Sequence, residues 1–126
     1  MDARKILLVD DAGTLLLLEQ MVLHSAGYQI VAAKDGEAGI RAALAHRPGL
    51  ILLDASPPGM TASEVCRRLR THEATGAIPI LLLASRGAGM PDEATEGGFP
   101  FGAEGCIMKP IDPSELLSKV RSLLGD

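Results

Sequence analysis

A run of four apolar residues that ends in an aspartate constrains the fold of this chain more than any other feature. Residues 50–53 read Leu-Ile-Leu-Leu, Asp54 follows directly, and a Pro-Pro-Gly turn comes soon after. A short continuous apolar run bounded by turn residues indicates a strand that is buried on both faces, in the middle of a parallel sheet. Asp54 then lies at the carboxyl end of that strand, where open α/β sheets place their binding sites. A strand-end aspartate can equally cap a helix or form a turn, so Asp54 alone leaves both interpretations open.

The rest of the chain alternates between strand-like and helix-like segments. The predicted strands are 5–9, 28–33, 50–53, 80–84 and 106–108. The predicted helices are 13–26 (ended by Gly27), a helix capped by Asp35 that runs to about Arg47 and is ended by Pro48–Gly49, 63–72, and a final helix to about residue 124. The final helix begins with Asp-Pro-Ser-Glu at 112–115, which supplies a cap, a proline at the first helical position and a glutamate three residues after the cap. This alternation predicts an α/β fold whose parallel sheet carries helices on both faces.

Right-handed crossovers bring the carboxyl ends of all five predicted strands to one edge of the sheet. The residues that follow those ends are Asp10, Asp11, Asp54, Ala84, Ser85 and Lys109. Three carboxylates held close together repel one another unless a cation shares the site, and oxygen ligands favour Mg²⁺. A carboxylate can act as a nucleophile toward phosphorus, and a lysine can pair with the phosphoryl oxygens. A buried salt bridge is the alternative, but three acids and one base leave excess negative charge.

Four motifs together resemble the receiver domain of two-component response regulators. They are KILLVDD, LILLD with its following PGM, IPILLLAS and GCIMKP, in the order and approximate spacing of that family. The resemblance covers the whole chain and implies one domain over residues 1–126. It also implies a flavodoxin-like fold with five strands in the order 2-1-3-4-5. The implied role is signalling, with phosphate taken from a histidine kinase or a histidine phosphotransfer protein, and the chain is not expected to be an enzyme.

By this resemblance Asp54 is the phosphoacceptor and Mg²⁺ is the cofactor. Asp11 would bind the metal directly together with Asp54, and Asp10 would reach it through water. Ser56 would donate its backbone carbonyl to the metal, and Lys109 would contact the phosphoryl group.

Two positions depart from the family pattern in the part that usually transmits the signal. The family usually has Thr or Ser where this chain has Ala84, and an aromatic residue where it has Cys106. Ser85 follows Ala84, but successive side chains on a strand point to opposite faces. The alternative function is therefore a switch-defective receiver that binds a protein partner whether or not it is phosphorylated.

The segment 86–104 departs from the family as well. It contains five glycines and two prolines, and its apolar periodicity is weak. We expect a long flexible loop; the alternative is a short helix over 90–96, with Pro91 near its start and Gly97 ending it.

Consecutive leucines at 15–18 cannot all face the sheet from one helix. If Leu15 and Leu18 face inward, Leu16, Leu17 and Met21 point outward and suggest a surface for a downstream protein partner. Scattered exposed leucines are also common on proteins with no partner at that site.

Composition argues against several other functions. The formal net charge is −4 without a basic run, which gives little support to nucleic-acid binding. No apolar stretch reaches membrane-spanning length and no signal peptide is evident, so we expect a cytoplasmic protein that does not bind membranes. Cys66 and Cys106 lack metal-ligand spacing and are interpreted as reduced core residues.

The sequence lacks the motifs that two enzymatic alternatives require. Phosphatases and phosphotransferases with an aspartyl nucleophile on the first strand need two aspartates separated by one residue, and Asp10–Asp11–Ala12 lacks that spacing. Nucleotide binding would need a glycine-rich loop after the first strand, and none is present.

Overall fold

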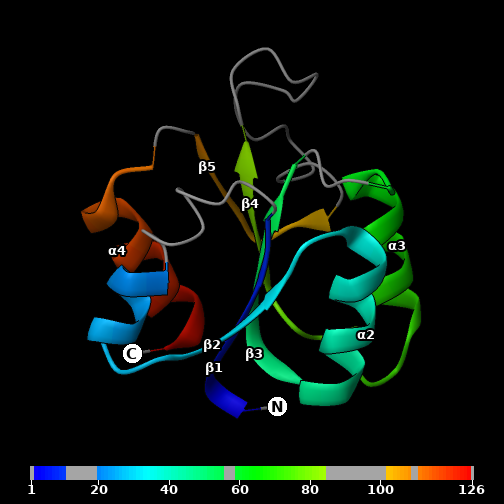
Figure 1. The fold of residues 1–126 in the computed structure, drawn as a ribbon, viewed down its shortest axis with the longest axis horizontal. Helices are drawn as coiled ribbons and strands as arrows, with labels where there is room; N and C mark the ends of the chain where they lie inside the picture. Colours follow the sequence, from blue (N-terminus) through cyan, green and yellow to red (C-terminus); the bar gives the residue numbers. More distant parts are fainter. Residues whose placement is uncertain (1, 11–19, 56–58, 85–101, 109–110, 126) are drawn as a thin grey trace.

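Five parallel strands form a single sheet in the computed structural model, which describes residues 2–10, 20–55, 59–84, 102–108 and 111–125. The strands are β1 (Asp2–Val9), β2 (Gln29–Ala33), β3 (Pro48–Asp54), β4 (Ile80–Ala84) and β5 (Gly105–Met108). Their order is β2-β1-β3-β4-β5, and each neighbouring pair is parallel (Figure 1). The predicted α/β class, the parallel sheet and its strand order are thus confirmed.

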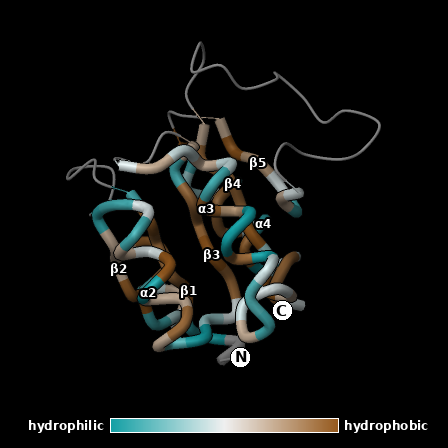
Figure 2. Tube along the Cα trace, turned by 90° about the vertical axis from the view of Figure 1, so that its right-hand side faces the viewer, coloured by the Kyte–Doolittle hydropathy of each residue, from teal (hydrophilic) through white to brown (hydrophobic). Residues whose placement is uncertain are grey.

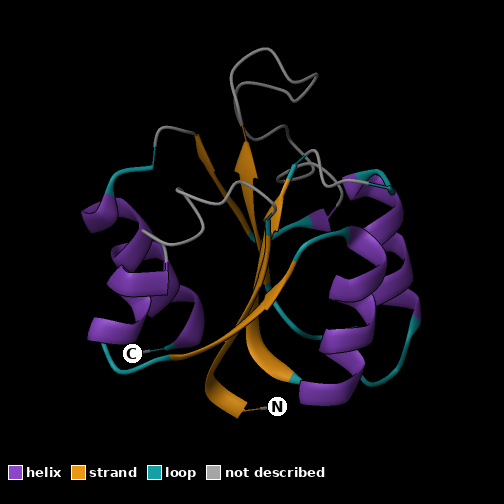
Figure 3. Cartoon of the chain, in the orientation of Figure 1, coloured by secondary structure: helices purple, strands orange, loops and turns teal. Residues whose placement is uncertain are grey.

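Helices cover both faces of this sheet. One face carries α2 (Gly36–His46) and α3 (Ala62–Thr71), and the other carries α4 (Pro113–Leu124) and the helical residues 20–25 (Figure 3). Of the helix predicted over 13–26, residues 13–19 lie outside the described part of the chain. No helix among the described residues is both long enough and apolar enough to cross a membrane.

The central strand β3 is buried along all seven of its residues. Its side chains alternate between the two core layers, so that Ile51 and Leu53 contact the layer under α2 and α3. Leu50 and Leu52 lie in the layer under α4. The hydrophobic colour of the central strands in Figure 2 follows this double burial, which explains why the run reads as four consecutive apolar residues.

The turn between α2 and β3 differs from the prediction. Asp35 does cap α2, since its Oδ1 accepts a hydrogen bond from the Ala38 N–H at 2.7 Å. The helix ends at His46, and Arg47 adopts the left-handed conformation with φ 47° and ψ 61°. The helix therefore ends just before Pro48–Gly49, as the sequence predicts, but these two residues belong to β3, which begins two residues earlier than predicted; Pro48 pairs with Asp2. One left-handed residue reverses the chain direction here, and proline is tolerated at the first position of a strand.

Helix α4 begins with the predicted signals. Asp112 Oδ1 accepts from the Ser114 N–H at 3.0 Å, and Pro113 opens the helix. Gly125 closes it in the left-handed conformation, with φ 78°. The side chains of Leu116 and Val120 are buried.

An arginine that the sequence did not single out holds the chain before β5. Arg70, at the carboxyl end of α3, donates to the carbonyls of Ile78 at 2.7 Å and Gly102 at 3.0 Å, and to Glu104 Oε1 at 2.7 Å. The same Glu104 oxygen accepts from the Ile80 N–H at 2.6 Å. The prediction of a flexible loop up to Glu104 is therefore wrong for residues 102–104, while 86–101 lies outside the described residues.

Candidate functional site

Asp54 is the last residue of β3, and its backbone is paired with β4. It pairs with Leu83 of β4, and the following residue, Ala55, donates its N–H to the Leu83 carbonyl at 2.8 Å. Only 8% of its surface is exposed. This side chain therefore emerges from a fixed backbone at the carboxyl edge of the sheet, as the sequence predicts.

Asp10 lies beside Asp54 on the neighbouring strand. Val9 of β1 pairs with Leu53, so Asp10 and Asp54 are the next residues on two strands about 4.8 Å apart. Asp10 is fully buried, and its N–H donates to the Ala33 carbonyl of β2 at 3.1 Å. This contact through Ala33 fixes the Asp10 backbone; sequence reasoning missed it because a backbone carbonyl leaves no signal in the residue type.

Ala84 ends β4 at the same edge of the sheet. It is fully buried and pairs with Met108, the residue directly before Lys109. A fully buried methyl group thus stands at the end of β4, within a fixed strand pairing. The structure confirms the strand-end position of Ala84, and the described chain ends one residue short of Lys109 on β5.

Four of the predicted site residues lie outside the described part of the chain, namely Asp11, Ser56, Ser85 and Lys109. Within the described residues, no group of three or more His, Cys, Asp or Glu side chains lies close enough to hold a metal ion. The two described acids, Asp10 and Asp54, supply only carboxylate oxygens. Such a donor set fits Mg²⁺ and excludes the sulfur and nitrogen ligation preferred by softer metals.

The two cysteines belong to the hydrophobic core, and neither is the last residue of a strand. Cys66 is buried in α3 and Cys106 is half-buried in β5, and both are free thiols. Burial raises the pKa of the Cys66 thiol from 9.0 to about 11. Burial also raises the pKa of Cys106. Both side chains are thus neutral near pH 7, which does not suit a nucleophile or a metal ligand.

Met21 is the exposed member of the predicted partner surface. It lies in the helical residues 20–25 and is 60% exposed, the highest exposure of any large apolar side chain among those described. Leu16 and Leu17 fall outside the described residues, so a patch formed by all three stays a prediction.

Comparison with known proteins identifies the family of this chain. The family model of the response regulator receiver domain matches residues 6–121. The DNA-binding dual master transcriptional regulator RpaA of Synechocystis sp. is 38% identical over 120 residues, which are 95% of this chain and 48% of that protein. The chain spans about half the length of the curated relatives that it matches.

Solved structures show the same architecture. The chemotaxis response regulator CheY4 of Vibrio cholerae superimposes with a TM-score of 0.82 at 28% identity, over 94% of this chain and 97% of that one. The receiver domain of the sensor histidine kinase PA1611 of Pseudomonas aeruginosa, solved with a magnesium ion coordinated in its active-site cleft, gives a TM-score of 0.84. At 24% identity over 98% of each chain, this second likeness bears on the fold alone. From the family match and the shared fold it follows that the chain belongs to the response regulator receiver domains.

Proposed function

We propose that this receiver domain accepts a phosphoryl group on Asp54, in a Mg²⁺-dependent reaction, from a histidine kinase or a histidine phosphotransfer protein. Receiver domains of response regulators accept phosphoryl groups in two-component signalling. The observation that carries the assignment to Asp54 is its position. It ends the fully buried central strand, directly between the strand that leads to Asp10 and the strand that ends in Ala84.

The bond changes assigned to Asp54 are those of an acyl phosphate. One carboxylate oxygen of Asp54 forms a bond to phosphorus while the bond between phosphorus and the donor's leaving atom breaks. The leaving atom, a nitrogen of phosphohistidine or an oxygen of a small phosphodonor, keeps the electron pair. Lys109 would contact the transferred group, and its positive charge would offset the charge on the phosphoryl oxygens.

A metal site at this edge is supported by the chemistry of its donors. Asp11 and Asp54 would bind Mg²⁺ directly, Asp10 would act through water, and Ser56 would add a backbone carbonyl. The bound ion would supply positive charge opposite the phosphoryl oxygens.

The test is incubation with acetyl phosphate in the presence of Mg²⁺ or of a chelator, followed by intact-mass measurement. We expect one phosphoryl group per chain with Mg²⁺ and almost none with the chelator. Asp11→Ala should lose the Mg²⁺ dependence of both labelling and amide chemical shifts. Equal labelling with and without Mg²⁺ would contradict the metal-dependent reaction.

Ala84 supports a second candidate function, a switch-defective receiver that binds its partner regardless of phosphorylation. A buried methyl at this position cannot donate a hydrogen bond to a phosphoryl oxygen. Cys106 likewise offers no aromatic ring to move. A folded chain that acetyl phosphate does not label under any condition would favour this second function.

The remaining expectations are part of the proposal. They are a single domain over residues 1–126, a cytoplasmic location, the lack of turnover of an external substrate, and an output partner at Leu16, Leu17 and Met21. RpaA is named as DNA-binding and is about twice as long, so our expectation of no nucleic-acid contact concerns only these 126 residues. Their net charge of −4 supports it, and DNA-binding measurements on this chain would test it.

A further inference from the structure

We propose that Arg70 is a positioning residue for phosphoryl transfer to Asp54, because it fixes the register of β5 and with it the place of Lys109. The inference rests on the proposed function, in which Lys109 contacts the transferred group. Arg70 hydrogen-bonds to groups just before β4 and β5, whereas Asp54 is the last residue of β3. Any effect of Arg70 on the reaction must therefore pass along these two strands.

The guanidinium of Arg70 joins two stretches of chain that are far apart in sequence. Its Nη1 donates to the carbonyls of Gly76 at 3.1 Å and Ile78 at 2.7 Å, which precede β4. Its Nη2 donates to the Gly102 carbonyl at 3.0 Å and to both carboxylate oxygens of Glu104, at 2.7 and 2.9 Å. One planar side chain with its donors in a fixed fork thus sets how the entries to β4 and β5 lie relative to each other.

Glu104 passes this restraint to the pairing of the two strands. Its Oε1 accepts a hydrogen bond from the Ile80 N–H at 2.6 Å, and its own N–H donates to the Ile80 carbonyl at 2.9 Å. Ile80 is the first residue of β4, and Glu104 directly precedes β5. Hydrogen bonds to a carboxylate are among the stronger ones in proteins. The two strands are therefore aligned before the first residue of β5 is paired.

Strand β5 specifies its own register weakly. It has four residues, begins with Gly105 and, in the part of the sheet that the structure describes, has β4 as its only neighbour. Its pairs with β4 run from Leu81–Gly105 to Ala84–Met108. A slip by one residue would move β5 by about 3.3 Å and turn each of its side chains to the other face.

The register at the carboxyl end of β5 decides where Lys109 begins. Lys109 is bonded to Met108, which pairs with Ala84. Leu83, the residue before Ala84, pairs with Asp54. A shift of β5 along β4 would carry Lys109 with it relative to Asp54. Displacing a group that contacts the reacting atoms slows a reaction strongly, so the rate depends on this register.

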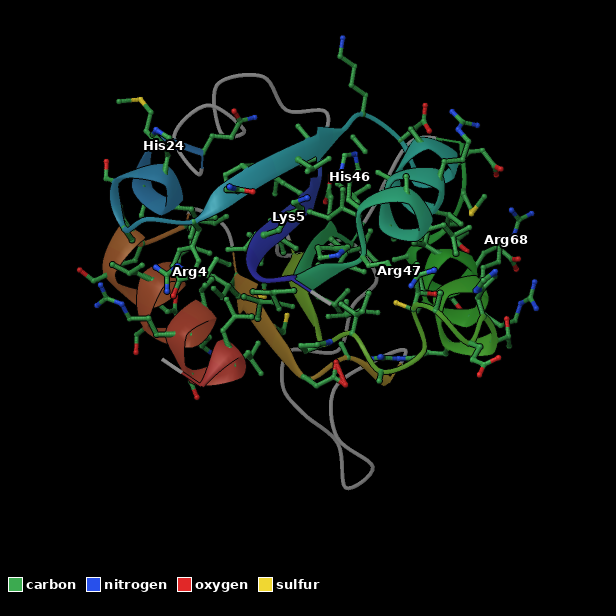
Figure 4. All side chains as sticks on the ribbon, turned by 90° about the horizontal axis from the view of Figure 1, so that it is seen from below. Arg4, Lys5, His24, His46, Arg47 and Arg68 are labelled. Atoms are coloured by element: carbon green, nitrogen blue, oxygen red, sulfur yellow. The ribbon has the colours of Figure 1, made fainter. Side chains whose placement is uncertain are left out.

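Arg68 supplies a matched control on the same helix. It forms ion pairs with Glu37 at 3.1 Å and Glu64 at 3.2 Å, which lie in α2 and α3. In the view from below, Arg68 lies on the outer side of the molecule (Figure 4). Arg68→Met thus removes ion pairs of the same kind whose partners belong to helices.

The test is the rate of labelling by acetyl phosphate at saturating Mg²⁺. We expect Arg70→Met to slow labelling about tenfold, and Arg68→Met to match the parent. Arg70→Lys keeps the positive charge with fewer donors, and its rate should fall between those of the parent and Arg70→Met. Glu104→Gln keeps an acceptor for the Ile80 N–H but loses the charge, so it should slow labelling by a smaller factor. The double variant Arg70→Met/Glu104→Gln should be no slower than Arg70→Met, because both changes break one connection.

The affinity for Mg²⁺ separates positioning from a general loss of structure. The proposed ligands come from the chain at the ends of β1 and β3, so a shift of β5 does not displace them. We expect the Mg²⁺ dissociation constant of Arg70→Met, measured by amide shifts, to equal that of the parent although its labelling is slower.

Parental labelling rates in both Arg70→Met and Glu104→Gln would overturn the positioning role. Equal slowing by Arg68→Met, or a loss of Mg²⁺ affinity that parallels the loss of rate, would overturn it too, because general destabilisation would then explain the effect. If Arg70→Met does not fold, Arg70→Lys and Glu104→Gln decide by the same comparison. A parent chain that acetyl phosphate does not label would refute the proposed function itself, and the positioning role with it.

Discussion

Asp35 and Asp54 are the same residue type in two different structural settings. Asp35 follows the end of β2 by two residues, and its carboxylate accepts the Ala38 N–H that opens α2. Asp54 belongs to β3 itself and pairs in register with Leu83, so its carboxylate extends from the sheet edge. The helices α2, α3 and α4 are capped by Asp35, Thr61 and Asp112, so Asp54 caps none of them, and its role as a site residue stays a prediction.

The cap at Asp35 has a measurable effect on stability. Asp35→Ala removes the acceptor for the Ala38 N–H and should lower the free energy of unfolding by about 1 kcal/mol. Asp35→Asn keeps an acceptor oxygen and should lie close to the parent. Urea unfolding of the three proteins checks this, and an unchanged midpoint in Asp35→Ala would mean that another group caps α2.

Cys66 gives the chain a pH dependence at alkaline pH. Burial raises the pKa of its thiol from 9.0 to about 11 in the folded state, so the unfolded chain ionises first. The stabilisation is fully present below pH 9.0 and is lost as the pH rises toward about 11. Urea unfolding should therefore show the parent losing stability relative to Cys66→Ala over that range. A constant difference between the two proteins would show that the thiol is not buried.

At the scale of elements, the Arg70–Glu104 pair connects the end of α3 to the starts of β4 and β5. Arg70→Met removes the hydrogen bonds to Ile78, Gly102 and Glu104, and should cost about 1–3 kcal/mol. Amide exchange in β5 should accelerate more than exchange in β1. Lys119→Met, which removes a single hydrogen bond to β5, is the matched control and should have a smaller effect.

Local chemistry explains which elements could be predicted. Residues 50–53 identified β3 because that strand is buried on both faces, and Asp-Pro-Ser-Glu identified the start of α4 because capping involves neighbours in sequence. The entry of Pro48 into β3 depends on the left-handed Arg47 and on pairing with β1. The contacts of Arg70 join residues up to 34 positions apart, and no local pattern encodes them.

At the candidate site, the predicted strand ends gave the correct positions of Asp10, Asp54 and Ala84 in the sheet. The Ala33 carbonyl that supports the Asp10 backbone has no signal in the sequence.

If Asp54 is phosphorylated as proposed, we expect the paired strands β4 and β5 to respond weakly. We expect a phosphoryl analogue with Mg²⁺ to cause smaller amide-shift changes in these strands than is usual for receiver domains, because Ala84 cannot donate a hydrogen bond worth about 1.5–3 kcal/mol to a charged acceptor. Ala84→Ser restores a donor with one added atom and should enlarge the changes along β4 and β5. Large changes in the parent confined to β5 and α4 would show that another contact transmits the signal.

At the scale of the whole molecule, the parallel sheet brings the carboxyl ends of its strands to one edge. That edge holds Asp10 and Asp54 within a fixed strand register. The central claim concerns this edge, and it is that Asp54 is the acid that takes up phosphate.

The most direct measurement is labelling by acetyl phosphate with Mg²⁺, read by intact mass and by mapping the labelled peptide. Asp54→Asn is compared with Asp35→Asn, a matched exchange of a carboxylate for an amide two residues after the edge strand β2. The account predicts one phosphoryl group on the parent and on Asp35→Asn, mapped to the peptide that contains Asp54, and none on Asp54→Asn. Labelling of Asp54→Asn at the parental rate and extent would contradict it.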